Sequence, residues 1–316
     1  MQRFFSFALL VGFSFSSFAA APPPAAEKGR GGREQSPLTW YDWIANTPRD
    51  YSLFYHRVFR KEELPAITLV VASSAILWVY DEQLLTAGKR WGKMWSISPD
   101  DNMSEAANVG GFPIQMPSDA GSAFYFIGDG WTHVSIAGAY LTYGGAFREV
   151  RALHTASQLA EAIVNTGISV QVLKHVTGRE SPLVSTGERG VWRMFPDQKK
   201  YHKHVSTYDA YPSGHVATAM ATMTVMAGNY PEYALGIQLV GYPLITLLSL
   251  QMLNNGVHWA SDYPLGLALG YTFGRIAVEN GKQPLPSEHA SWWERTKFMP
   301  ISPGPASYGL QMVTTL

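Results

Sequence analysis

Six apolar segments of helix length dominate this sequence and limit the folds it can adopt. They cover approximately residues 64–80, 126–147, 152–175, 213–229, 232–253 and 261–279. No run of short strands with alternating polarity separates them, so the sequence predicts an all-α class. We expect a six-helix bundle with short extensions at both ends.

The sequence leaves open whether this bundle crosses a membrane. Residues 233–253 carry no charge and are long enough to span a bilayer, whereas the segment 152–175 contains Glu161 and Lys174. A soluble bundle with unusually buried helices explains the pattern as well as six spans do. Small residues permit close helix approach in either setting: Ala137, Gly138, Gly144, Gly145, Gly266, Gly270 and Gly274.

The first 21 residues are typical of a secretory signal peptide, with an uncleaved anchor as the alternative. Arg3 precedes an apolar segment, and small residues near Ala21 offer a cleavage site. We therefore expect an exported protein of the periplasm or cell envelope. A flexible leader and an aromatic segment would cover 22–60, the helical domain 61–280 and a C-terminal tail 281–316. The aromatic residues of 39–60 fit either a membrane-surface belt or a short helix packed on the domain.

Charge and cysteine content exclude several functions. The formal net charge is zero, so nothing suggests a nucleic-acid partner. The chain has no cysteine, which excludes disulfides, thiolate metal sites and a cysteine nucleophile. His202 and His204 have no evident third ligand, so we predict neither a metal site nor a cofactor.

The first cluster of polar residues lies where the segment 152–175 ends. Lys174 is in its last turn, Gly178 is a plausible C-cap, and Arg179 follows. Two cations near one turn can bind a phosphate, although such residues also complement a helix C-terminus without binding anything.

The second cluster is Pro212-Ser213-Gly214-His215, at the start of the next apolar segment. Ser213 is a natural N-cap, and amides at a helix N-terminus attract anions. We expect the amides of Ser213 and Gly214 to bind phosphate and His215 to donate a proton beside it. A histidine exposed in the first helical turn is the simpler alternative.

The third cluster contains His258 and Asp262, four residues apart. A carboxylate bonded to one imidazole nitrogen fixes the tautomer and leaves the other nitrogen as a nucleophile. Asp262 could instead cap the following helix. The three clusters together supply a phosphate cradle, a proton donor and an oriented nucleophile, which is the set that covalent phosphoryl transfer needs.

Residues 64–280 resemble the type 2 phosphatidic acid phosphatase (PAP2) superfamily, which includes secreted bacterial acid phosphatases and vanadium haloperoxidases. The family pattern is Lys, six residues, Arg-Pro; then Pro-Ser-Gly-His; then Ser-Arg, five residues, His, three residues, Asp. Here the matches are Lys174, Pro182, residues 212–215, His258 and Asp262. The resemblance implies that His258 forms a phosphohistidine, Asp262 orients it, and His215 is the acid and base. Lys174, Arg179, Ser213 and Gly214 would bind the phosphoryl oxygens.

The sequence departs from the family at both arginines. Ser181 and Met252 occupy those positions, and two missing charge-assisted bonds of roughly 1.5–3 kcal/mol each would slow catalysis by orders of magnitude unless replaced. Arg179 could substitute, as could the basic loop before the second cluster, which contains Arg189, Arg193, Lys199, Lys200, His202, Lys203 and His204. We expect a metal-independent phosphatase acting on a phosphorylated small molecule or lipid, with possible membrane association. The alternatives are a degenerate protein that binds a phosphorylated ligand or has a structural role, and vanadate-dependent halide oxidation.

Overall fold

The computed structural model describes residues 42–109, 112–281, 296–304 and 307–314, so the signal-peptide prediction lies outside the described residues. The described helices are α2 (Asp42–Ala45), α3 (Thr47–Val58), α4 (Leu64–Met94), α5 (Ala120–Phe126), α6 (Gly130–Phe147), α7 (Val150–Thr177), α8 (Gln198–Lys203), α9 (Gly214–Asn229), α10 (Ala234–Asn254) and α11 (Tyr263–Asn280). The strands are β1 (Met103–Val109), β2 (Phe112–Pro117), β3 (Thr296–Gly304) and β4 (Ser307–Thr314).

The all-α class is confirmed in its coarse form, because the described residues are mostly helical. All six apolar segments are helical and correspond to α4, α6, α7, α9, α10 and α11. The count of six is not confirmed, since α2, α3, α5 and α8 are additional short helices. The largest boundary error is in α4, which continues to Met94, because an amphipathic stretch after Tyr80 extends the apolar part.

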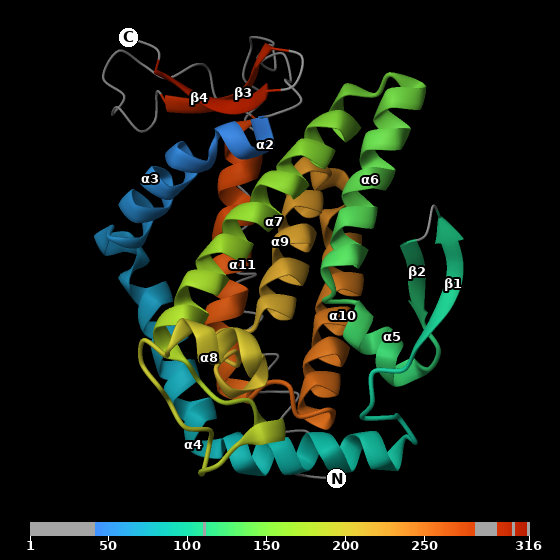
Figure 1. Ribbon diagram of the computed structural model, residues 1–316, viewed down its shortest axis with the longest axis vertical. Helices are drawn as coiled ribbons and strands as arrows, with labels where there is room; N and C mark the ends of the chain where they lie inside the picture. Colours follow the sequence, from blue (N-terminus) through green and yellow to red (C-terminus); the bar gives the residue numbers. More distant parts are fainter. Residues whose placement is uncertain (1–41, 110–111, 282–295, 305–306, 315–316) are drawn as a thin grey trace.

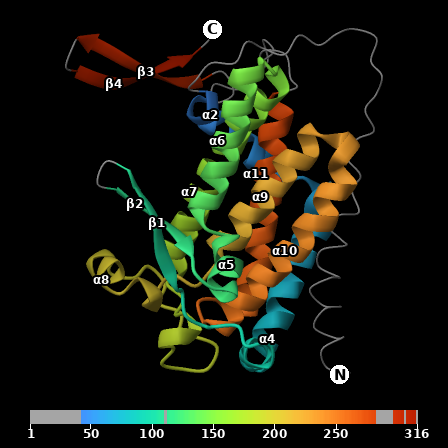
Figure 2. The same ribbon diagram turned by 90° about the vertical axis from the view of Figure 1, so that its right-hand side faces the viewer.

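Helix α9 lies at the centre of the bundle, between α7, α10 and α11 (Figures 1 and 2). Its only titratable side chain is His215 near its start, and its alanines at 217 and 221 are fully buried. A helix that is apolar on all sides is stable only when other helices surround it, so the sequence of α9 accounts for its position.

Glycines in α11 allow it to approach α9 closely. A Cβ atom at Gly270 would lie 2.1 Å from the carbonyl oxygen of Ala217, and one at Gly266 would lie 2.6 Å from that of Ser213. The predicted role of the Gly266, Gly270 and Gly274 stripe is confirmed. This contact also fixes the start of α11 against the start of α9.

The N-terminal aromatic segment forms helices that pack on the bundle. Phe54 stacks on Phe273 of α11 with ring centroids 4.9 Å apart, and Tyr51 meets the same ring edge-on at 5.4 Å. This agrees with the packed-helix alternative for residues 39–60, as far as they are described.

Two antiparallel hairpins accompany the helices. The tail forms β3 and β4, as the strand character of its last residues indicates, and β3 contacts α2 and α3. The pairing of β1 with β2 was not predicted, although two glycines at 110–111 separate the strands and are a recognised turn signal.

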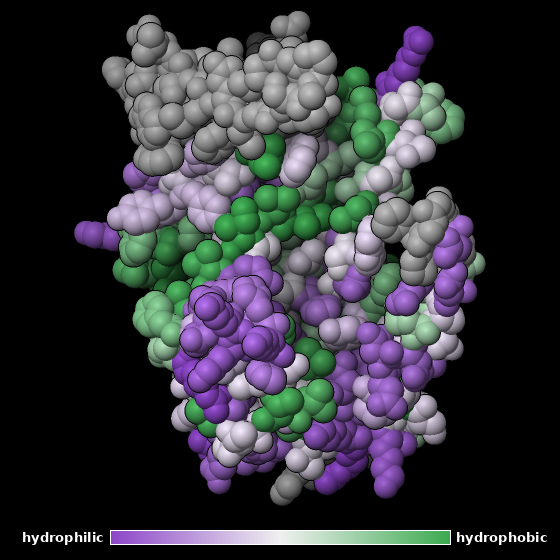
Figure 3. Space-filling model, viewed as in Figure 1, coloured by the Kyte–Doolittle hydropathy of each residue, from purple (hydrophilic) through white to green (hydrophobic). Residues whose placement is uncertain are grey.

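Two described helical stretches, Lys61–Met94 and Pro231–Asn254, are long and apolar enough to cross a membrane. Only 6% and 17% of their most apolar windows are buried inside the protein, so most of these side chains face outward. Figure 3 shows a further hydrophobic band along α7, above a hydrophilic region over α8. Ile168 and Val172 are exposed hydrophobic residues of α7. Length and composition of these two helices therefore allow membrane contact.

Candidate active site

The three predicted clusters meet at one end of the bundle. Helix α7 ends there with Lys174 in its last turn, while α9 begins with Gly214 and His215. His258 and Asp262 lie just before α11, which starts at the same end (Figure 1). Segments up to 90 residues apart in the chain thus contribute to one site.

His258 is buried, with 1% of its surface exposed, and its tautomer is fixed by the backbone. Its Nδ1 lies 2.7 Å from the carbonyl oxygen of Ala210 and 3.4 Å from Oδ2 of Asp262. A carbonyl oxygen only accepts hydrogen bonds, so Nδ1 carries the proton and Nε2 has the free lone pair. The sequence predicts that Asp262 orients His258, and in the structure the carbonyl oxygen of Ala210 also orients it.

Asp262 is itself held by two donors. Nη1 of Arg179 donates to its Oδ1 at 2.5 Å, and the amide of Trp259 donates to its Oδ2 at 2.8 Å. The carboxylate is fully buried behind His258. It can stabilise positive charge on the imidazole through space while its own position is fixed.

Arg179 is fully buried, and its guanidinium donors are all occupied. Besides Asp262, Nη1 bonds Ser261 Oγ at 2.7 Å and Nη2 bonds Asp81 Oδ2 at 2.7 Å. The Arg189 carbonyl oxygen accepts from both Nε and Nη2. An arginine side chain has five N–H donors, and these contacts use all of them. In this geometry Arg179 has no donor left for a phosphate, contrary to the expected role.

His215 faces His258 across the site. Their ring centroids are 6.2 Å apart, and the ring centroid of Tyr125 of α5 lies 4.6 Å from that of His215. Burial, together with the neighbouring His258 and Lys174, lowers the pKa of His215 to about 3. The His215 ring is therefore neutral at pH 7 in the free protein.

The start of α9 offers fewer amides than the sequence suggests. The amide of Ser213 donates to the carbonyl oxygen of Asp262 at 3.0 Å, so it cannot bind a phosphate in this conformation. The Ser213 hydroxyl caps the helix by accepting weakly from the Val216 amide at 3.5 Å. The amides of Gly214 and His215 donate to no acceptor among the described residues. An anion site at this N-terminus would use these two amides.

Lys174 lies in the site but already pairs with a carboxylate. Its Nζ is 2.7 Å from Oδ2 of Asp209, and Tyr201 donates its hydroxyl proton to the other oxygen at 2.5 Å. An ammonium group has three donors, so Lys174 keeps two for another ligand. The Asp209 charge nevertheless offsets much of the attraction of Lys174 for a phosphate.

The two departures from the family pattern are buried residues. Ser181 is 4% exposed, and its hydroxyl has no hydrogen-bond partner among the described residues. Met252 is fully buried, with its sulfur 3.8 Å from Ser213 Oγ. Neither side chain carries a charge that could replace an arginine.

The basic loop does not bring its cations into the site in this structure. Arg193 pairs with Glu180, and Arg189 lies over the Trp78 ring at 4.8 Å. The remaining basic residues, Lys199, Lys200, His202, Lys203 and His204, are exposed on or next to α8. No group of three or more potential metal ligands occurs among the described residues.

Four contributors to the site were missed at the level of sequence. Asp209 and Ala210 lie three and two residues before the Pro-Ser-Gly-His motif, so their proximity was a usable signal. Asp81 of α4 is the first charge after the uncharged stretch 64–80, which is an unusual place for a carboxylate. Tyr125 gave no signal, since only the packing of α5 brings it to His215.

The bundle brings two histidines, a lysine and a helix N-terminus together at one end, and these are groups that suit a phosphate. Residues 155–290 match the family model of the PAP2 superfamily, and this range contains all three motifs. The resemblance seen in the sequence is therefore confirmed over that part of the chain.

One curated relative is lipid A 1-phosphatase of Porphyromonas gingivalis, which is 30% identical over 94 residues. The match covers 30% of this chain and only 20% of the relative's length. No solved structure matches the chain.

Proposed function

We propose that this protein is a phosphatase of the PAP2 type that hydrolyses phosphoric esters through a phosphohistidine. The observation that carries the proposal is the pair of facing imidazoles, with Nε2 of His258 free and His215 at a centroid distance of 6.2 Å. A nucleophile with a free ring nitrogen and a neighbouring imidazole that can exchange a proton are the two groups that covalent phosphoryl transfer needs.

In the first step Nε2 of His258 attacks phosphorus, the P–N bond forms and the P–O bond to the leaving group breaks. His215 delivers a proton to the leaving oxygen. Its ring is neutral in the free protein, because its pKa is about 3. The negative charge of a bound phosphate offsets the nearby cations and raises that pKa, so His215 gains its proton in the complex.

In the second step the neutral His215 removes a proton from water, which attacks phosphorus and breaks the P–N bond. Inorganic phosphate leaves, and His258 returns to the tautomer that bonds the Ala210 carbonyl oxygen. Lys174 and the amides of Gly214 and His215 stabilise the phosphoryl oxygens in both steps. Every role belongs to a side chain or amide of the protein, so we expect turnover without an added metal.

Arg179 and Asp262 act together as positioning residues in this scheme. Arg179 fixes Asp262 with a bond of 2.5 Å, and Asp262 stabilises the cationic imidazole from 3.4 Å. This role follows from the fully occupied guanidinium and replaces the phosphate-binding role that the sequence suggested.

We further propose a phosphorylated lipid as the substrate, in the cell envelope. The name of the P. gingivalis relative, lipid A 1-phosphatase, supports this class. Two helices long enough to contact or cross a membrane and the signal-like first 21 residues agree with it. A lipid substrate can also gain binding energy from its apolar part, which would partly offset the missing arginines.

The test measures phosphate release by the full chain in mild detergent. The substrates are para-nitrophenyl phosphate, phosphatidic acid, an isoprenyl diphosphate and lipid A, each with and without a chelator. The variant is His258→Ala, and His56→Ala is the matched control because His56 is an exposed histidine of α3. We expect chelator-resistant release from at least one lipid substrate, retained in the His56 variant and abolished in the His258 variant.

A protein without catalysis, which binds a phosphorylated ligand weakly or has a structural role, is the second candidate, because the charges of the site disfavour a tightly held phosphate. Among the charged groups described here, Lys174 and Arg179 face three carboxylates, those of Asp81, Asp209 and Asp262. Such a site binds phosphate weakly unless groups move. Negligible phosphate release from every substrate by the wild type and the His56 variant would contradict the proposed phosphatase activity and support this candidate.

A further inference from the structure

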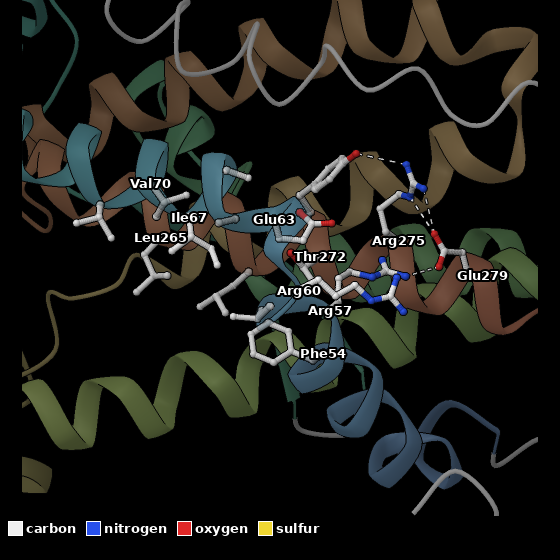
Figure 4. Close-up of a pocket in the computed structure, with 16 residues that line it drawn as sticks. Phe54, Arg57, Arg60, Glu63, Ile67, Val70, Leu265, Thr272, Arg275 and Glu279 are labelled. Atoms are coloured by element: carbon white, nitrogen blue, oxygen red, sulfur yellow. Dashed lines mark hydrogen bonds and ion pairs between the residues drawn. The ribbon is translucent and has the colours of Figure 1, made fainter. Parts of the chain in front are cut away.

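A groove lies between α3, α4 and α11, away from the residues of the active site (Figure 4). Its volume is about 540 Å³, which is within the usual range for small-molecule sites. Residues at 265, 268, 269 and 272 of α11 line it, whereas the glycines at 266, 270 and 274 face α9. The two faces of α11 therefore serve different purposes.

One part of the groove is apolar. Phe54, Ile67, Val70 and Leu265 form this part, and Figure 4 shows them on the three surrounding helices. From Leu265 to Arg275 the helix rises by about 15 Å, at 1.5 Å per residue. Half of a hydrocarbon core of about 30 Å is the same length, so the groove is long enough for one acyl chain of a single leaflet.

The other part of the groove is cationic. Arg57 and Arg275 both pair with Glu279, so two guanidinium groups share one carboxylate. Arg60 is exposed, and its side chain has no partner among the described residues. Glu63 is the other carboxylate of the lining. The three arginines thus leave a net positive charge and free N–H donors at this part of the groove, where a phosphate would be bound well.

The cationic part is distinct from the active site. Arg275 is 13 residues beyond Asp262 on α11, which corresponds to about 20 Å along the helix. A phosphate held by these arginines cannot reach His258. The groove is therefore not the place where a substrate phosphate would react.

We propose that this groove binds one molecule of an anionic phospholipid. Its phosphate contacts Arg57, Arg60 and Arg275, and an acyl chain lies along the apolar part. The rim supports an apolar environment, since Phe59, Leu64 and Val71 expose 71%, 56% and 62% of their surfaces. The combination of an acyl-length apolar channel and a cationic end fits an anionic amphiphile better than a soluble phosphate.

The test is lipid binding to the full chain in detergent, measured by native mass spectrometry. Phosphatidylglycerol and phosphatidylcholine are titrated separately, with glycerol 3-phosphate as a competitor. Arg60→Ala removes an arginine that pairs with no described residue, and Ala268→Trp fills the groove. Arg90→Ala is the matched control, because Arg90 is an exposed arginine of α4 that does not line the groove.

We expect phosphatidylglycerol to bind more tightly than phosphatidylcholine. Arg60→Ala should weaken the phosphatidylglycerol complex about fivefold, as for one partly exposed charged contact, and Arg90→Ala should not. Ala268→Trp should weaken both lipids. Equal affinity for the two lipids, an unchanged Arg60 variant, or full displacement by glycerol 3-phosphate would overturn the proposal. Phosphate release is a separate measurement, so lipid binding can still be interpreted if the phosphatase assay shows no activity.

Discussion

The pairing of Lys174 with Asp209 sets the charge that a phosphate meets at the candidate active site. The Nζ atom of Lys174 is 2.7 Å from the carboxylate, and the lysine side chain is only 7% exposed against 27% for the aspartate. The resemblance implies that family members have two arginines at the site, and their positive charge would outweigh the negative charge of such a carboxylate. Here Ser181 and Met252 supply no charge, so Asp209 weighs more heavily.

Asp209→Asn should therefore strengthen phosphate binding. A unit charge about 6 Å from a bound phosphate is worth roughly 2–3 kcal/mol at an effective dielectric constant of 20, and screening reduces this. We expect inorganic phosphate to bind roughly tenfold more tightly, measured by calorimetry. Glu232→Gln is the matched control, because it breaks the Arg151 ion pair at the other end of α9. Weaker binding in the Asp209 variant would mean that Asp209 is needed to place Lys174.

Which residues of the site could be predicted depends on whether their role is local in sequence. The spacing of His258 and Asp262 and the motif ending at His215 placed these residues together without a structure. The sequence could not show that the guanidinium donors of Arg179 are all in use, because its partners Asp81 and Ser261 come from α4 and from the segment before α11. The amide of Ser213 likewise cannot bind a phosphate because it bonds the carbonyl oxygen of Asp262, which is 49 residues away in the sequence.

At the scale of elements, the contact of α9 with α11 aligns the two halves of the site. His215 begins one helix and Asp262 precedes the other, so a shift of α11 would separate the imidazoles. The glycine stripe made this contact predictable from sequence, since only a residue without a Cβ atom fits there. The β1–β2 hairpin and α5 were not predicted, because their short segments have no strong periodicity.

Gly270→Ala should therefore destabilise the protein. The new methyl group would lie 2.1 Å from the Ala217 carbonyl oxygen, so the helices must separate, at a cost of about 1–3 kcal/mol. Gly138→Ala of α6 is the matched control, because its methyl group would meet nothing within 4 Å and alanine favours the helix by roughly 0.5–1 kcal/mol. Thermal unfolding should show a lower midpoint for the first and an equal or higher one for the second. Equal midpoints would show that α11 adjusts without loss.

At the scale of the whole molecule, a buried carboxyl pair joins the N-terminal helices to the bundle. Asp50 of α3 and Glu161 of α7 are 0% and 2% exposed and lie in hydrogen-bonding contact. Asn280 of α11 donates to both, at 2.5 Å and 2.8 Å. Burial raises the pKa of both carboxyl groups, that of Glu161 to about 7. The pair therefore retains a proton under conditions where exposed carboxyl groups have lost theirs.

This raised pKa makes the stability of the fold depend on pH in a defined direction. The folded protein keeps a proton on Glu161 that the unfolded chain loses near its ordinary pKa of 4.5. The stability that this bound proton contributes to the folded state is therefore fully present below pH 4.5. It is lost as the pH rises to about 7, and the loss amounts to about 3 kcal/mol at most. Burial lowers the pKa of His133 to about 4, which has the opposite effect on stability. The unfolded chain takes up this proton first, so stability is lost as the pH falls below about 6.5.

Glu161→Gln isolates the carboxyl contribution from that of the histidines. The amide keeps the shape and a donor for Asp50 but does not titrate, so its free energy of unfolding should decline less than that of the wild type between pH 5 and pH 8. Chemical unfolding at both pH values measures the difference, and Glu62→Gln, an exposed carboxyl of the same region, is the control that should follow the wild type. Parallel pH profiles for all three proteins would mean that the Asp50–Glu161 pair does not hold the proton.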